Sequence, residues 1–271
     1  MMLALYGALI VLLAWSVARA VDWYPAHLAH EEEAMLAAIS AQLAGDEASF
    51  AAWEAAQGTP FGGVAWRRFV SGTPAFNRQT GLAVVLVLLV ATWSLMTHGA
   101  TLLAASWLIF GAGLVVLAFV DAHTKLLPDA LTLPLLWLGV VLQLFPETRT
   151  VGLEASIWGV LAGYLPMWLL AQLYRLLRGR DGLGMGDVKM LAAMGAWSGA
   201  AVLPSVIFVA SLLGIAGVLC FRLSRRVRRA DDHSHELDDS HELHAEFPFG
   251  PWIIAAYMIC HILDVNMMLR T

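Results

Sequence analysis

Long apolar segments dominate the chain, and short polar segments separate them. An α-helix needs about 20 apolar residues to cross a bilayer, and runs near that length recur along the whole sequence. Eight such runs lie at residues 3–20, 81–97, 100–120, 130–145, 151–173, 188–200, 201–222 and 248–267. The pattern predicts an all-α fold, a polytopic membrane helix bundle with about eight transmembrane helices.

Composition supports a membrane protein. Hydrophobic residues make up 59% of the 271-residue chain, charged residues make up 14%, and the mean hydropathy is +0.71. A soluble domain carries about 25% charged residues, so the lipid bilayer is the first predicted partner. The net charge of -5 comes mainly from acidic loop clusters, and no basic patch with interleaved aromatic residues is present. The composition therefore predicts no nucleic-acid partner.

Three regions follow from the spacing of the apolar runs. We assign residues 1–20 to a first transmembrane helix, 21–80 to a cytoplasmic helical segment and 81–271 to a membrane-embedded core. Within the second region, apolar residues recur at helical spacing and predict one or two amphipathic helices. They are Leu36, Ile39, Leu43, Phe50 and Trp53. We interpret this region as a helical cap on the spans or the lipid interface, with substrate docking as the alternative.

The N-terminal run resembles a signal peptide only in part. Ala18-Arg19-Ala20 has the small residues of a cleavage site, but the start of the chain carries no basic residue ahead of the apolar run. A signal peptide has such a basic region. We therefore expect a retained transmembrane helix.

Lysine and arginine predict the topology, because cytoplasmic loops keep the basic residues. Placing residues 21–80 on the cytoplasmic side puts 14 of the 16 basic residues at that face, and leaves Arg149 and Arg270 outside. This arrangement predicts a multi-pass protein whose N-terminus is periplasmic. Asp121 and Asp187 then lie at the cytoplasmic ends of their apolar runs.

These two aspartates are the main candidate chemistry. An unpaired ionisable group at the hydrocarbon edge costs roughly 2 to 4 kcal/mol, so its presence there suggests a function. Two carboxyls that face each other share one proton and titrate as a pair. One can then deprotonate a water while its protonated partner polarises a peptide carbonyl and later protonates the leaving amine. The residues alone leave open a proton or ion relay in a transporter, a helix cap at Asp187, and a loop acid at Asp121 near Lys125.

The residues around the aspartates suit such a site. Gly184 and Gly186 precede Asp187 and would let a substrate backbone approach, or let the chain adopt dihedrals closed to other residues. Pro128 should separate two spans. Asp129 then falls where the N-cap of the next helix is expected.

Cysteine and histidine provide no predicted metal site. Cys220 and Cys260 lie within apolar runs and have no CxxC partner, so we interpret them as core residues. Residues 231–244 are rich in His and Asp and repeat Ser-His-Glu-Leu. Neither His-Glu pair has a second His four residues after the first, so a solvated loop is favoured over a metal site.

Three strings together resemble the type IV prepilin peptidases, a family of GxGD aspartic proteases. They are DAHTKLLPDALTLPLLWLG from Asp121, GLGMGDVKMLAAMGAWSG from Gly182 and PFGPW from Pro248. The strings occur in the family's order, and the resemblance covers about residues 100 to 265. It implies that Asp121 and Asp187 are the catalytic pair. No cofactor is then needed for proteolysis.

The resemblance also implies roles for neighbouring residues and for the substrate. Asp129 would support the site, Lys189 would attract acidic substrate groups or lipid phosphates, and Pro248, Gly250 and Pro251 would form a turn that shapes it. The substrates would be prepilins or pseudopilins of type IV pili or type II secretion. Their basic leader would be cut after Gly at the cytoplasmic face of the bacterial inner membrane.

One departure from the family concerns methylation. Bifunctional members carry two CxxC pairs in the first cytoplasmic loop and methylate the new N-terminus with S-adenosylmethionine, whereas residues 21–80 contain no Cys. We therefore favour peptidase activity alone. The presenilin branch of GxGD proteases fits less well, because Val120 stands where that branch has Tyr and PFGP replaces Pro-Ala-Leu.

Overall fold

The computed structural model describes residues 1–43, 77–179, 184–231 and 249–268. The helices are α1 (Met2–Leu43), α4 (Arg78–His98), α5 (Leu102–Thr124), α6 (Asp129–Leu142), α7 (Leu153–Arg178), α8 (Met185–Ser198), α9 (Leu203–Asp231) and α10 (Gly250–Met268). These described residues contain no strand. Phe50, Trp53, Pro248 and most of the His-rich stretch 231–244 lie outside them, so the predictions made there stay predictions.

The predicted fold class is confirmed. Each of the eight apolar runs coincides with one helix of the structure, and α1, α4, α5, α7 and α9 are long and apolar enough to cross a membrane. Apolar segments of α6 and α10 are shorter. The protein is therefore a multi-pass helical membrane protein, with eight spans as the prediction and five long candidate spans in the described part.

The first helix differs from the predicted first span. We expected that span to end at residue 20, but α1 continues without a break through Pro25 to Leu43. Leu36, Ile39 and Leu43 are exposed on this extension. They therefore belong to the same helix as the first apolar run, instead of to a separate amphipathic helix.

The chain divides into two compact units, Met1–Trp93 and Ser94–Thr271. In the first unit, α1 runs antiparallel to the part of α4 that this unit contains. The Tyr6 hydroxyl donates to the Ala91 carbonyl oxygen at 3.1 Å, and the Asn77 amide donates to Asp22 at 3.4 Å. Asn77 also starts α4, because its side-chain oxygen accepts from the Thr80 amide.

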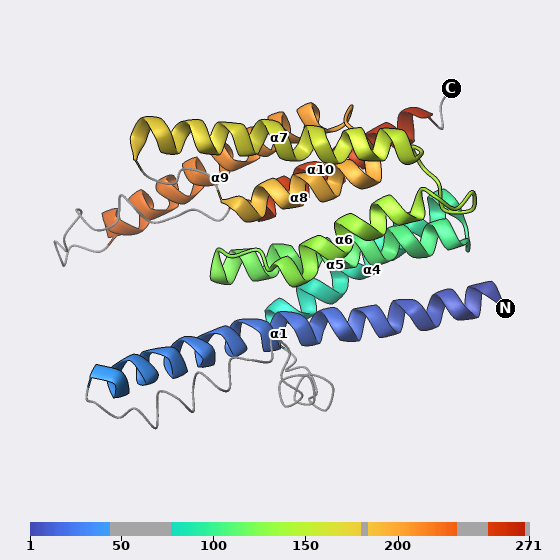
Figure 1. Cartoon of the computed structure of the whole chain (residues 1–271). Helices are drawn as coiled ribbons and strands as arrows, with labels where there is room; N and C mark the ends of the chain where they lie inside the picture. The colour runs from blue at the N-terminus through green and yellow to red at the C-terminus, as the bar shows by residue number, and fades with distance from the viewer. Residues whose placement is uncertain (44–76, 180–183, 232–248, 269–271) are drawn as a thin grey trace. The chain divides into compact units, whose positions relative to one another are not determined.

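Within the second unit, α8 is the central helix, packed between α6 and α7 (Figure 1). Nearly every residue from Val188 to Trp197 is buried. A side chain at Gly159 would strike the backbone of Gly195, and one at Gly163 would lie 2.6 Å from the Leu191 oxygen. Glycines four residues apart on α7 thus let two helix backbones touch, as small residues do in membrane bundles.

Candidate active site

Asp121 lies in the last turn of α5 and is almost fully buried, with 5% of its surface exposed. Its side-chain oxygen Oδ2 accepts a hydrogen bond from the backbone N–H of Gly250 at 3.0 Å. That N–H belongs to the first residue of α10, where helix donors have no partner inside the helix. The carboxyl is therefore held by the start of a helix 129 residues later in the chain. It is no interfacial loop acid.

Only glycine fits at position 250. An added Cβ would lie 2.6 Å from Asp121 Oδ2 and 2.8 Å from its Cγ. Real Cβ atoms do not approach other atoms so closely, and the nearby atoms belong to a buried carboxyl. Gly250 therefore allows the α10 backbone to reach Asp121.

Asp187 is the third residue of α8 and lies outside the candidate spanning helices. Burial raises the pKa of its carboxyl from 3.8 to about 7, and the negative charge of Asp121 acts in the same direction. The two aspartates therefore lie close enough to interact electrostatically. No side-chain hydrogen bond caps the start of α8, whose N-cap residue is Gly184. The helix-cap interpretation of Asp187 is not supported.

The glycines before Asp187 do not adopt the backbone dihedrals closed to other residues that we considered. Gly184 has a φ of −66°, and Gly186 is a helical residue that is not among those with positive φ. Instead, a Cβ at Gly186 would lie 2.6 Å from Leu127 Cβ. Gly186 lets the α5–α6 linker lie against the start of α8.

We expected Asp129 to be the N-cap of α6, and this was wrong. Pro128 occupies the N-cap position, without a side-chain cap bond. Asp129 begins the helix, and both of its carboxylate oxygens accept from Lys189 Nζ at 2.7 Å. The Lys189 side chain is 26% exposed and that of Asp129 is 54% exposed. The cation predicted to attract substrate or lipid groups thus pairs within the protein.

The start of α10 is held against α9 by two aromatic rings. A Cβ at Gly214 would lie 3.2 Å from the Phe249 ring, and one at Gly217 would lie 2.5 Å from the Trp252 ring. Pro251 is the second residue of α10, which suits its fixed φ. These contacts place Gly250 beside Asp121. The sequence prediction did not single out these glycines of α9, although small residues on a span often lie at a helix contact face.

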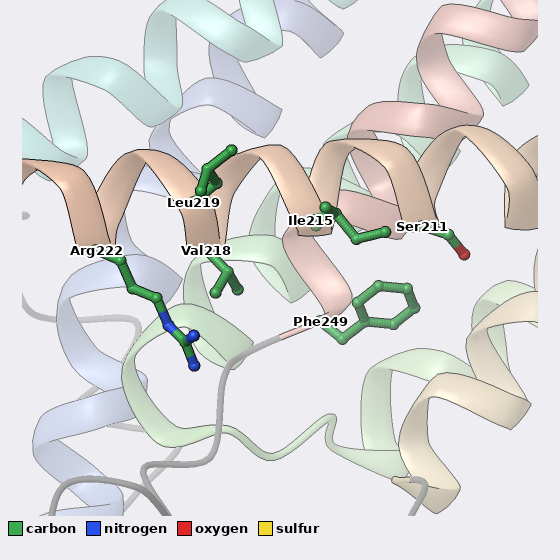
Figure 2. Close-up of a pocket in the computed structure, with 7 residues that line it drawn as sticks. Ser211, Ile215, Val218, Leu219, Arg222 and Phe249 are labelled. Atoms are coloured by element: carbon green, nitrogen blue, oxygen red, sulfur yellow. The ribbon is translucent and has the colours of Figure 1, made fainter.

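Phe249 separates two hollows of very different size. A groove of about 540 Å³ follows α9 and is lined by Ser211, Gly214, Ile215, Val218, Leu219, Arg222 and Phe249. Figure 2 shows Val218 and Arg222 pointing from α9 toward the same side as Phe249. A cavity of about 30 Å³ contains Asp187 and shares Phe249 with the groove. That cavity can hold a water molecule and is too small for a peptide.

Among the described residues, no group of three or more His, Cys, Asp or Glu could hold a metal ion. Cys220 is exposed and Cys260 is buried, and both are free thiols. The site therefore consists of two coupled carboxyls, a backbone donor and an ion pair. Such a site can carry out acid–base chemistry with water.

Known proteins match the part of the chain that carries these residues. Residues 108–219 match the model of the type IV leader peptidase family. The chain is 40% identical over 152 residues to a prepilin leader peptidase/N-methyltransferase of Neisseria gonorrhoeae, covering 56% of this chain and 50% of that protein. A protein of the same name from Dickeya chrysanthemi is 38% identical over 204 residues, or 75% of this chain and 62% of that protein.

A shorter and more similar match comes from Dichelobacter nodosus. Its prepilin leader peptidase/N-methyltransferase is 47% identical over 108 residues, which is 40% of this chain and 37% of that protein. The chain thus spans about half the length of these three relatives. No solved structure matches. The resemblance found in the three strings is confirmed, because the segment 108–219, with both aspartates, matches the model of the type IV leader peptidase family.

Proposed function

We propose that this chain is an aspartic endopeptidase that removes the basic leader of type IV prepilins or pseudopilins. The bond is cut after Gly, at the cytoplasmic face of the bacterial inner membrane. One observation carries the proposal: two motifs 66 residues apart bring together a buried carboxyl and a half-buried carboxyl that interact electrostatically. Such a pair shares a proton, as hydrolysis by an aspartic dyad requires.

The surroundings give the two carboxyls different roles. Asp121 accepts the Gly250 N–H, which orients its carboxyl, and we assign it the role of the general base that deprotonates the attacking water. Burial keeps Asp187 protonated near neutral pH, since its pKa is raised to about 7. Asp187 would therefore donate to the scissile carbonyl oxygen and later supply the proton to the leaving amine. This chemistry uses no cofactor.

The neighbouring residues would hold the pair in place. Gly250 and Pro251 begin the helix that reaches Asp121, and the resemblance adds Pro248, which lies outside the described residues. Pro128 is the N-cap residue of α6, and Gly184 and Gly186, which have no side chains, precede Asp187. Asp129 and Lys189 form an ion pair beside them. None of these groups needs to contact the scissile bond.

The transporter alternative has less support. Transport sites lie near the bilayer midplane, in broken and internally repeated helices. Asp121 lies in the last turn of α5 and Asp187 in the first turn of α8, and both helices are continuous. The relatives reported above are prepilin leader peptidases.

Methyl transfer is a separate activity. The names of the relatives include N-methyltransferase. Residues 21–80 of this chain, however, contain no Cys and so lack the two CxxC pairs of bifunctional members. We expect peptidase activity without methyl transfer, which would otherwise require S-adenosylmethionine. Mass spectrometry of the mature substrate decides: an unmodified N-terminal amine supports this expectation, and a methylated amine contradicts it.

The peptidase proposal is tested by co-expressing the chain with a prepilin. We expect a mobility shift of the substrate, with N-terminal sequencing that places the cut after Gly. Asp121→Ala and Asp187→Ala should each abolish the shift while the protein still accumulates in the membrane. Full processing by either variant would disprove the dyad.

A further inference from the structure

The α5–α6 linker and the start of α8 are joined at two points. Leu127 fills the space that a side chain at Gly186 would need. Two residues after Leu127 and three after Gly186, Lys189 Nζ donates to both carboxylate oxygens of Asp129 at 2.7 Å. The second contact is an ion pair in which one ammonium nitrogen lies equally close to both carboxylate oxygens, and such charge-assisted hydrogen bonds are short and strong.

These two contacts connect the segments that carry the aspartates. Asp129 follows Asp121 by eight residues, and Lys189 follows Asp187 by two. The linker between α5 and α6 is short. It runs from Lys125, the left-handed residue that ends α5, to Pro128, which occupies the N-cap position of α6. A displacement at the ion pair can therefore move both of the segments that carry the carboxyls.

The exposure of the pair indicates where its effect should be seen. Both side chains are partly solvated, at 26% and 54% exposure, and such pairs contribute little to the free energy of unfolding. Catalysis is far more sensitive to placement, since a displacement of about 1 Å at a reacting group can cost roughly 100-fold in rate. An ion pair at this position can thus matter greatly for rate and little for stability.

We propose that Asp129 and Lys189 are positioning residues, whose ion pair sets the separation of Asp121 and Asp187 and hence the proton sharing between them. This inference rests on the proposed peptidase function. It also assigns Lys189 a partner other than a substrate acid or a lipid phosphate. Removing either charge should let the linker and the start of α8 move apart.

The kinetic test uses three variants in purified full-length protein. Two are the single variants Asp129→Asn and Lys189→Gln, and the third is a double variant that swaps the charges, Asp129→Lys together with Lys189→Asp. We expect each single variant to lower kcat roughly 10- to 100-fold, to leave KM within about twofold and to shift the pH profile of kcat. The charge swap and Lys189→Arg should recover most of the activity. Lys125→Asn removes a cation from the same linker and is the matched control, with kcat expected to be unchanged.

Several outcomes would overturn the proposal. A rise in KM with kcat unchanged, for Lys189→Gln alone, would assign Lys189 to binding an anionic group of the substrate. An unchanged kcat in both Asp129→Asn and Lys189→Gln would show that the ion pair does not position the two aspartates. A loss of thermal stability equal to the loss of activity, with an unshifted pH profile, would assign it to folding alone.

A second measurement does not depend on peptidase activity. Spin labels at the exposed positions Ala122 and Met185, in a chain whose two native cysteines are replaced, report the distance between α5 and α8. We expect a narrow distribution with the native pair and a broader or longer one with Lys189→Gln. An unchanged distribution would contradict the positioning role, even if the wild-type chain proves to cleave nothing. The failure of the two proposals can thus be told apart.

Discussion

The two ends of α8 are built in different ways. At the C-terminal end, Trp197 is buried, stacks on Phe110 with ring centroids 4.3 Å apart, and donates its indole N–H to the Leu135 carbonyl oxygen at 2.9 Å. At the N-terminal end, Asp187 lies beside a small cavity, and the contacts are those of Gly186 with Leu127 and of Lys189 with Asp129. One end is closed by aromatic packing, and the other holds charged side chains beside a small cavity.

This difference separates stability from chemistry along one helix. Ten residues of helix separate Asp187 from Trp197, or about 15 Å. Aromatic packing contributes most to stability where it is fully buried, whereas a pair of acids needs access to water and substrate. We therefore expect substitutions at the two ends to have opposite consequences.

Substitution of the dyad should have the largest effect on activity. Asp121→Asn and Asp187→Asn keep the shape of each side chain but remove its acid–base chemistry, which contributes roughly 10²- to 10⁴-fold to a rate. We expect cleavage of a prepilin substrate to fall by at least that factor, with no loss of folded protein in the membrane. Comparable activity in either variant would show that the charged end of α8 is not catalytic.

Substitution of Trp197 should have the opposite effect. Trp197→Ala leaves a cavity next to Phe110 and removes the hydrogen bond to Leu135, and such a change typically costs about 3 to 5 kcal/mol. A thermal-unfolding scan in detergent should show a clearly lower Tm. The fraction that stays folded should cleave substrate at close to the normal rate, and a selective loss of kcat instead would mean that the two ends are coupled.

Gly250→Ala should reduce activity by an intermediate amount. The added methyl group would lie 2.6 Å from Asp121 Oδ2, so the carboxyl or the start of α10 must shift. We expect kcat to fall roughly 10- to 100-fold in a cleavage assay. Gly81→Ala is the control, because an added Cβ there meets no atom within 4 Å.

The titration of Asp187 should also make stability depend on pH. The folded-state pKa of Asp187 is raised from 3.8 to about 7, so the folded protein keeps a proton that the unfolded chain releases. Its contribution to stability therefore falls as pH rises from about 4 to 7. Asp187→Asn cannot titrate, so the Tm of this variant relative to wild type should increase across that window and level off above it. A constant difference between pH 4 and 8 would contradict a raised pKa.

Much of the architecture could be predicted from the sequence, because each membrane helix is a long run of apolar residues. All eight apolar runs became helices, since a backbone in lipid must satisfy its hydrogen bonds within the segment. The boundaries were less accurate at the first helix. Hydropathy records where lipid ends, and α1 continues beyond that point to Leu43.

The candidate site was predicted in its residues but not in its contacts. Asp121 and Asp187 are recognisable as acids at the ends of apolar runs, and the three strings pointed to Gly250, Asp129 and Lys189. Their local roles were partly wrong. Asp129 pairs with Lys189 instead of capping α6, because a pairing across 60 residues has no local mark in the sequence.

The sequence by itself determined the class of protein, the helices and the two acids, because hydropathy and charge act on each segment separately. Tertiary structure decided which groups surround those acids. The Gly250 N–H reaches Asp121, Leu127 packs on Gly186, and Phe249 and Trp252 fit against Gly214 and Gly217. Each of these contacts depends on how two distant helices approach, and that approach is set by packing across the whole unit.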